Sequence, residues 1–195
     1  LKLRYMPFGL APKLRHLAPT NTRTGPLPFW PLAAFIKHAI GVPMTAAVDA
    51  SNHDAFLSSV VPAGNIYASA DDASRVFQML LNGGELDGVR VLKPETVADA
   101  IRPVGKMQLD RTLFLPMRYS PGFMLGQNPV GLYGLRSGAA FGHLGFLTVL
   151  CWAAPARDIS VAFLNTGKSF APAMYTRLIG LSQYGFHVTC AADGS

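Results

Sequence analysis

Two apolar stretches near the end of the chain constrain its fold more than any other feature. Residues 146–153 and 159–164 are largely apolar, and Pro155-Ala156-Arg157-Asp158 separates them. Two such stretches joined by a turn that contains proline and aspartate predict an antiparallel β-hairpin. Because neither stretch alternates apolar with polar residues, we expect both faces of the hairpin to be buried.

The clearest helix of the sequence is predicted well before this hairpin. Ser69 followed by Asp72 resembles a capping box, with aspartate in place of the usual glutamate. One apolar stripe at helical spacing follows it, formed by Ala73, Val76, Phe77, Leu80 and Leu81. Asn82-Gly83-Gly84 then ends the helix.

Shorter patterns predict further helices over residues 31–40, 94–101 and 171–181, and short strands over 89–92 and 123–125. Residues 42–62 show no clear period. The order of helices, hairpin and closing helix favours an α/β chain of the α+β kind, in which helices pack on an antiparallel sheet. A doubly wound arrangement is disfavoured.

Composition limits the class of protein. Half of the 195 residues are hydrophobic and 14% are charged, which excludes a disordered chain. The net charge of +6 is spread singly from Lys2 to Arg177, so we interpret it as a solvated surface and expect no nucleic-acid partner. No run of eighteen apolar residues predicts a transmembrane segment. Cys151, in an apolar run, is expected to be a small buried hydrophobe, and the compartment stays open.

Several motifs fail on inspection. Gly167-Lys168-Ser169 resembles the end of a phosphate-binding loop, but Ala162 stands where that loop needs its first glycine, so we expect a turn with a solvated lysine. The five histidines and two cysteines lack metal-ligand spacing, and no dinucleotide-binding glycine pattern occurs. We therefore predict no metal and no cofactor. Asn52-His53-Asp54 is interpreted as a polar loop.

The chain also contains no recognisable nucleophile. No serine has the G-x-S-x-G context of an α/β-hydrolase elbow. No serine is followed three residues later by lysine, the arrangement in which one helical turn brings an amine to a hydroxyl, and no Tyr-x-Asn occurs. No catalytic residue is therefore assigned within these 195 residues.

Two stretches nonetheless resemble one family. Residues 61–97 contain Pro62-Ala63-Gly64-Asn65, the capped helix ending in Leu80-Leu81-Asn82-Gly83-Gly84, and Lys93-Pro94-Glu95-Thr96. Phe141-Gly142-His143-Leu144-Gly145-Phe146 then precedes the hairpin. Both resemble the β-lactamase-related serine hydrolases, which include penicillin-binding-protein-like proteins and class C β-lactamase-like esterases. The resemblance covers residues 60–170 well and the remainder loosely.

The resemblance implies roles for four residues. The family's Lys-Thr-Gly signature, on the edge strand beside its active site, falls on His143-Leu144-Gly145. Phe146 then takes the position whose backbone amide completes the oxyanion hole, and a glycine at 145 leaves room for the substrate to approach. At neutral pH a histidine carries less positive charge than the signature lysine of the family. Leu144 takes the place of the signature threonine and lacks its hydroxyl. The pair suggests a neutral, apolar acyl group, as in the esterase members.

The same resemblance implies a fragment. The family's Ser-x-x-Lys and Tyr-x-Asn lie upstream, so we expect the chain to be the C-terminal portion of one β-lactamase/transpeptidase-like domain, incomplete alone and packed against its missing N-terminal half. Within it we assign residues 1–60 to irregular and helical cover and residues 61–105 to a helix-turn-strand-helix segment. Residues 106–170 are assigned to the strands of the sheet, 171–186 to a closing helix and 187–195 to a tail.

Three hypotheses for function follow. The first is a serine hydrolase of the β-lactamase-related type, a carboxylesterase that acts on a small-molecule ester or amide through an acyl-enzyme, with its nucleophile in the missing part. The second is a catalytically inactive binding or interaction module on the same scaffold, which the absent nucleophile favours. The third, a β-lactamase or peptidase, is disfavoured by His143 and Leu144.

Overall fold

A six-stranded antiparallel sheet forms the centre of the computed structural model, which describes residues 1–26, 30–62, 64–110, 116–146 and 148–169. The strands lie in the order β11-β10-β9-β6-β5-β4. Their bounds are β4 Val104–Leu109, β5 Pro116–Tyr119, β6 Met124–Leu125, β9 Phe141–Gly145, β10 Val149–Ala154 and β11 Ile159–Phe163. The predicted α+β class with an antiparallel sheet is confirmed.

The predicted hairpin is present as β10 and β11, joined by a 3₁₀ turn over Pro155–Arg157. Its first strand begins at Val149, three residues later than the apolar stretch indicated, because residues 146 and 148 belong to the turn from β9. Burial also differs between the two strands. β10 is mostly buried, whereas β11 is half-buried throughout because it lies at the edge of the sheet.

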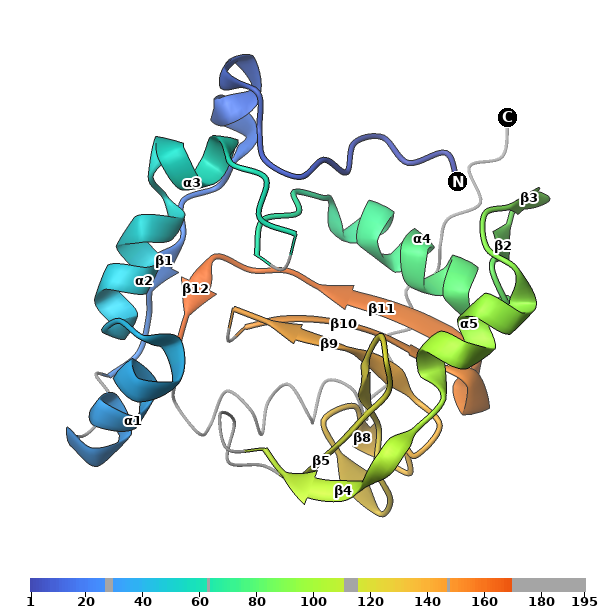
Figure 1. Ribbon diagram of the computed structural model, residues 1–195. Helices are drawn as coiled ribbons and strands as arrows, with labels where there is room; N and C mark the ends of the chain where they lie inside the picture. The colour runs from blue at the N-terminus through green and yellow to red at the C-terminus, as the bar shows by residue number, and fades with distance from the viewer. Residues whose placement is uncertain (27–29, 63, 111–115, 147, 170–195) are drawn as a thin grey trace.

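Helix α4 (Ala70–Leu81) covers one face of this sheet, over β10 and β11 (Figure 1). Its predicted cap is confirmed, since the Ser69 side chain accepts a hydrogen bond of 3.0 Å from the backbone N–H of Asp72. Helix α5 (Pro94–Ile101) follows the short hairpin β2 (Glu85–Leu86) and β3 (Val89–Arg90). The layer between helices and sheet is a core cluster of Met79, Leu80, Leu86, Val97, Leu125, Phe141 and Ala153.

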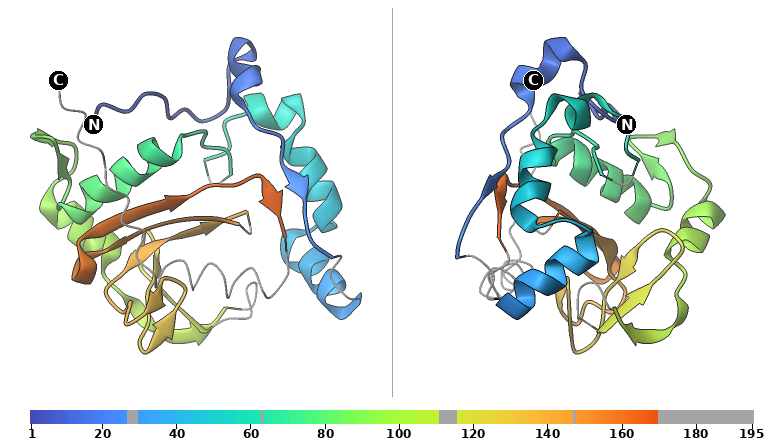
Figure 2. Two further views of the ribbon diagram at one scale, coloured as in Figure 1. Left: turned by 180° about the vertical axis from the view of Figure 1, so that it is seen from behind. Right: turned by 60° about the vertical axis from the view of Figure 1, so that its left-hand side comes forward.

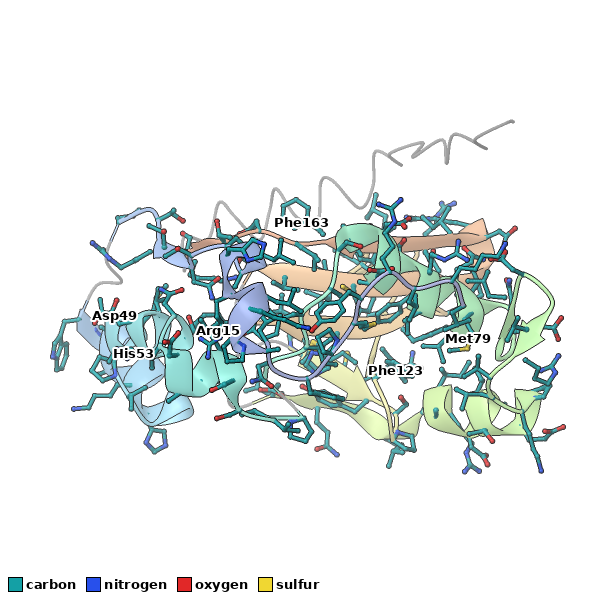
Figure 3. The ribbon with its side chains drawn as sticks, turned by 90° about the horizontal axis from the view of Figure 1, so that it is seen from above. Arg15, Asp49, His53, Met79, Phe123 and Phe163 are labelled. Carbon is teal, nitrogen blue, oxygen red and sulfur yellow. The ribbon has the colours of Figure 1, made fainter. Side chains whose placement is uncertain are left out.

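Aromatic rings extend this layer. Phe123 packs against Phe77 of α4, with ring centroids 6.1 Å apart, and against Phe141 of β9, at 5.2 Å. Met79 and Phe123 are labelled in Figure 3, which looks down on the molecule so that α4 lies in front of the strands. Phe141 is therefore a core residue on the α4 side of the sheet.

The opposite face of the sheet carries a second core cluster, formed by Met117, Leu132, Tyr133, Ala140, Leu144, Leu150, Trp152 and Ala154. The small hairpin β7 (Val130–Gly131) and β8 (Gly134–Leu135) covers part of this face. Tyr133 between these strands stacks on Trp152, with ring centroids 5.9 Å apart.

Three helices lie at one end of the sheet, away from α5 (Figures 1 and 2). They are α1 (Trp30–Ile40), α2 (Met44–Ser51) and α3 (Asp54–Ser58), preceded by the 3₁₀ turn η1 (Pro12–Leu17). The helix predicted over residues 31–40 is confirmed, while α2 and α3 occupy the stretch in which the sequence showed no period. In Figure 3, Arg15 lies beside this end, where its guanidinium pairs with Asp54.

The first ten residues run beside α4. The backbone N–H groups of Arg4 and Tyr5 donate to the buried carboxylate of Asp72, at 2.9 and 3.4 Å. Further along, β1 (Thr22–Arg23) pairs in parallel with β12 (Gly167–Lys168), which follows β11. The closing helix predicted over 171–186, and the tail over 187–195, lie outside the described residues. Among the described helices, none has the length and apolar character needed to cross a membrane.

Candidate functional site

The four residues singled out by sequence lie at the end of β9 and in the turn to β10. Phe141 packs under α4, and side chains alternate along a strand, so His143 and Gly145 face the α4 side of the sheet. Leu144 faces the other side, where it is 7% exposed and packs within the second core cluster. The structure therefore separates the side chains of His143 and Leu144, and Leu144 offers the site only its backbone.

The backbone of β9 has two differently paired sides. Gly126 lies opposite Ala140, and its N–H donates to Ala140 O at 2.7 Å. Because hydrogen-bonded pairs recur at every second residue of an antiparallel ladder, the pair Met124–Gly142 is also of the hydrogen-bonded kind. Because successive residues direct their N–H and C=O groups to alternate sides, Gly145 bonds to β10, opposite Val149. Leu144 then directs its groups toward the β6 side. β6 begins at Met124, so no described strand pairs with that side of β9 beyond Gly142.

Among the described strands, β9 is thus paired on both sides at its start and on one side only at its end, and we call the unpaired side the open side of β9. Phe146 continues the pattern. The C=O of Gly145 points to β10, and in a trans peptide the following N–H points the opposite way, so the Phe146 N–H is directed to the open side. Phe146 is half-buried and has a φ of 33°, and its own C=O accepts from Thr148 N–H at 2.9 Å.

The glycines of β9 are required for different reasons. A Cβ on Gly142 would stand 2.2 Å from the carbonyl oxygen of Cys151, so the fold itself excludes a side chain there. A Cβ on Gly145 would meet only Val149 atoms at 3.7 and 3.8 Å, an ordinary contact. Packing among the described residues therefore does not explain the glycine at 145.

His143 is exposed, and none of the hydrogen bonds formed between described residues involves its ring. Directly opposite it on β10 lies Cys151. Burial raises the pKa of the Cys151 thiol to about 11, although a hydrogen bond with the Phe163 backbone lowers it in part. The thiol is therefore protonated at neutral pH and is not an activated nucleophile. The described residues hold no group of three metal-ligating side chains.

A buried lysine lies behind the turn, and it corrects the sequence analysis. Lys168 was expected to be solvated, but it is 2% exposed. Its Nζ donates to Asn165 O at 2.8 Å and to the Thr148 hydroxyl at 3.4 Å, and it lies 5.2 Å from the centre of the Phe146 ring. Sequence reasoning missed this cluster. The one local signal was a threonine at 148 inside an otherwise apolar run.

Two other polar features lie away from the end of β9. An open groove of about 550 Å³ runs along β4 and β5 and includes Tyr119, whose hydroxyl donates to Asp110. No residue from 143 to 146 lines it. In the predicted polar loop, His53 precedes α3, and Asp54 pairs with Arg15 instead of with the histidine.

Solved structures share this fold. A family VIII carboxylesterase superposes with a TM-score of 0.71 at 21% identity, over 92% of this chain and 46% of its own. A penicillin-binding protein homologue from Caulobacter crescentus gives 0.69 at 23% identity, over 92% and 47%. The fold is therefore β-lactamase/transpeptidase-like, and the chain spans about half the length of these structures.

Residues 12–182 match the Beta-lactamase family, and the chain belongs to this family of serine hydrolases. Among curated proteins, the Esterase/beta-lactamase LipL of Mycobacterium tuberculosis is 30% identical over 109 residues. That stretch is 56% of this chain and 24% of LipL.

Proposed function

We propose that this chain supplies the oxyanion strand of a carboxylesterase that works through an acyl-enzyme. The Phe146 N–H is one of the two donors that stabilise the oxyanion, the amide of the nucleophile being the other. The supporting observation is the backbone geometry: at the end of β9 the Phe146 N–H is directed to the side of the strand with which no described strand pairs. A substrate carbonyl oxygen placed on that side would accept from it. One such donor contributes about 2.7–4 kcal/mol to the transition state.

The glycine at 145 supports the same role. A substrate that lies against the open side of β9 needs a flat strand, and no contact within the described residues requires a glycine at this position. Gly145→Ala is therefore expected to lower kcat/KM about 10- to 100-fold through misplaced substrate while the protein stays folded.

Esters are favoured over β-lactams because of the side chain at 143. The exposed His143 takes the place of the signature lysine that meets the drug's carboxylate in β-lactamases, and Leu144 faces the core instead of presenting a hydroxyl. The names of the similar proteins, a family VIII carboxylesterase and an esterase/β-lactamase, agree with an ester or amide substrate.

We place the nucleophile and its lysine base outside these 195 residues, in an N-terminal part of the same protein. The 46% coverage of the carboxylesterase supports this placement. So does the outermost strand, β4, on which Val104, Met107 and Leu109 are each more than half exposed. An upstream part that packs on this chain would cover such apolar surface.

A second function, that of an inactive binding module, is favoured by one observation: Ser-x-x-Lys and Tyr-x-Asn are both absent from the chain. Reading the gene upstream of Leu1 for Ser-x-x-Lys separates the two. Finding the motif supports the esterase, and its absence from the full reading frame supports the binding module.

The kinetic test uses the full gene product with a short-chain aryl ester and a chromogenic cephalosporin. We expect ester turnover that is lost when the upstream serine is changed to alanine, and slow cephalosporin turnover. His143→Lys, which restores the signature charge, is expected to raise cephalosporin turnover relative to ester turnover. Rates equal to buffer hydrolysis on both substrates would refute the enzyme hypothesis.

A further inference from the structure

Lys168 presents a physical problem that the fold does not explain. Its side chain is almost fully buried, and no carboxylate among the described residues lies within ion-pair distance of its Nζ. A buried charge without a counter-ion is unfavourable. Burial accordingly lowers the pKa of Lys168. A methionine or leucine of similar length would fill the same space without this disadvantage.

Each contact of the lysine head group with the described residues is made either with the turn after β9 or with Asn165, which is hydrogen-bonded to that turn. Its Nζ lies over the face of the Phe146 ring at 5.2 Å, within the range of a cation–π contact. It also donates to the hydroxyl of Thr148, which is fully buried. Asn165, whose carbonyl accepts from the lysine, donates from its Nδ2 to Thr148 O at 2.9 Å. The lysine therefore contacts both described residues of the turn after β9.

The backbone of Lys168 is held independently of that turn. β12 pairs in parallel with β1, and Thr24 N–H donates to Lys168 O at 2.9 Å. Next to it, Thr22 N–H donates to Thr166 O, also at 2.9 Å. The lysine thus connects a fixed strand pair to a turn in which Phe146 has a φ of 33°, a conformation that side chains larger than glycine rarely adopt.

We propose that Lys168 is a positioning residue that fixes the turn of Phe146 and so aims the Phe146 N–H at the oxyanion. The cation holds the ring from one side, and the hydrogen bond to Thr148 fixes the far end of the turn. This inference rests on the proposed function of the Phe146 N–H. It explains why a charge is buried at this place.

The kinetic test compares Lys168→Met, which removes the cation, with Lys168→Arg, which keeps it, in the full gene product acting on a short-chain aryl ester. A misplaced donor weakens the transition state and not the ground state, so Lys168→Met is expected to lower kcat about 10- to 100-fold with KM nearly unchanged. Lys168→Arg is expected to retain most of kcat. Lys13→Met, at an exposed lysine, is the matched control and is expected to have no effect.

Thr148→Val keeps the shape of the threonine but removes the hydroxyl that accepts from Nζ, and it is expected to lower kcat by a smaller factor. If Lys168→Met does not fold, the kcat of Thr148→Val tests the positioning role of Lys168 instead. A folded Lys168→Met protein with unchanged kcat would overturn the proposal. So would an unchanged kcat in Thr148→Val when Lys168→Met is unfolded.

A second readout does not depend on turnover. In full-length protein labelled with ¹⁵N-phenylalanine, the Phe146 amide resonance is assigned by its disappearance in Phe146→Leu. Lys168→Met is expected to move this resonance and to leave that of Phe77, on α4, in place. If the wild-type protein has no esterase activity but the resonance moves, the proposed function fails and the positioning contact stands. If the resonance does not move, the positioning role is wrong.

Discussion

Two regions each bury a charge and each contain a glycine next to a turn. The first is helix α4 with its flanking turn, residues 69–92, and the second runs from the end of β9 to Lys168, residues 145–168. They use these residues differently. The carboxylate of Asp72 accepts hydrogen bonds from the backbone N–H groups of Arg4 and Tyr5, and although burial raises its pKa, these bonds and the charge of Arg4 outweigh it and favour the charged form. Lys168 also has neutral partners among the described residues, but there burial prevails and lowers its pKa, which disfavours the charged form.

The glycines of the two regions, Gly84 and Gly145, also differ in whether the fold requires them. Gly84 has a φ of 97°, and a Cβ there would lie 2.3 Å from the Leu92 carbonyl oxygen. Gly145 meets no such obstacle. In the α4 region each unusual residue is therefore explained by stability alone. In residues 145–168, stability does not explain Gly145 or Lys168. Residues that are kept without a benefit to stability are commonly kept for function, and we interpret these two in that way.

The largest difference is expected between the two glycines. Gly84→Ala combines a strained backbone with a clash against a carbonyl, and we expect it to lower the free energy of unfolding by about 3–5 kcal/mol. Gly145→Ala is expected to change it by less than about 1 kcal/mol, because its backbone is ordinary and its neighbours are at van der Waals distance. Urea denaturation measures both. A Gly145→Ala protein as unstable as Gly84→Ala would remove the distinction between the regions.

The two buried charges provide the next comparison. Asp72→Ala leaves the Arg4 and Tyr5 N–H groups without their acceptor, and we expect a loss of about 2–3 kcal/mol in the free energy of unfolding. Lys168→Met is expected to change it by less than about 1 kcal/mol, since an apolar side chain replaces a desolvated charge.

Asp71→Ala is the matched control for Asp72. It lies one residue earlier in the same helical turn but is exposed, so it shares the favourable position at the helix N-terminus without the bonds to Arg4 and Tyr5. We expect it to lower stability by less than about 1 kcal/mol.

If Lys168→Met instead destabilises the protein as much as Asp72→Ala, the lysine is a structural residue of the ordinary kind.

The contrast also explains what could be predicted from sequence. The α4 region was predicted almost completely, because its signals are local: Ser69 caps the helix, the apolar stripe has the helical period, and Asn82-Gly83-Gly84 ends it. The helices α2 and α3 were not predicted. They are short, and α2 buries only Met44, Val48 and Ser51, so no clear stripe marks them.

At the hairpin end the local signals failed for a physical reason. The apolar run begins at Phe146, but the strand begins at Val149, and hydrophobicity does not distinguish a buried turn from a buried strand. The burial of Lys168 depends on β12 pairing with β1, more than a hundred residues away in the chain. The candidate residues themselves were located by family resemblance, whereas their separation onto two faces of the sheet required the structure.

The charge contrast has a consequence for pH. Burial alone raises the pKa of Asp72, but hydrogen bonds from Arg4, Ser69 and Tyr5 and the charge of Arg4 outweigh it and hold the pKa below the ordinary value of 3.8. The unfolded chain then binds this proton more readily than the folded one. Stability from Asp72 is complete above the unfolded pKa and is lost as the pH falls through the lower, folded value.

Denaturation of the wild type and of Asp72→Asn at pH values from 6 down to about 2 tests this. The difference between the two proteins is expected to shrink as the pH falls. The lowered pKa of Lys168 acts in the same direction at the other end of the pH scale: between its folded pKa and the ordinary value of 10.5, the unfolded chain is the more protonated state, so the contribution of Lys168 to stability increases with pH. A difference between wild type and Asp72→Asn that is constant with pH would show that Asp72 is not the titrating group.

The smallest effects are expected at two residues near the surface, one from each region. Ser69→Ala removes the cap of α4 and leaves the Asp72 N–H without its acceptor, so we expect a loss of about 1 kcal/mol in the free energy of unfolding. His143→Ala removes an exposed ring with no hydrogen bond to the described residues, so we expect a change within about 0.5 kcal/mol. The same substitution is expected to alter the KM for an ester, whereas Ser69→Ala leaves KM unchanged. A stability loss at His143 equal to that at Ser69 would mean that the histidine serves the fold, and the assignment of the end of β9 to substrate binding would lose its side-chain support.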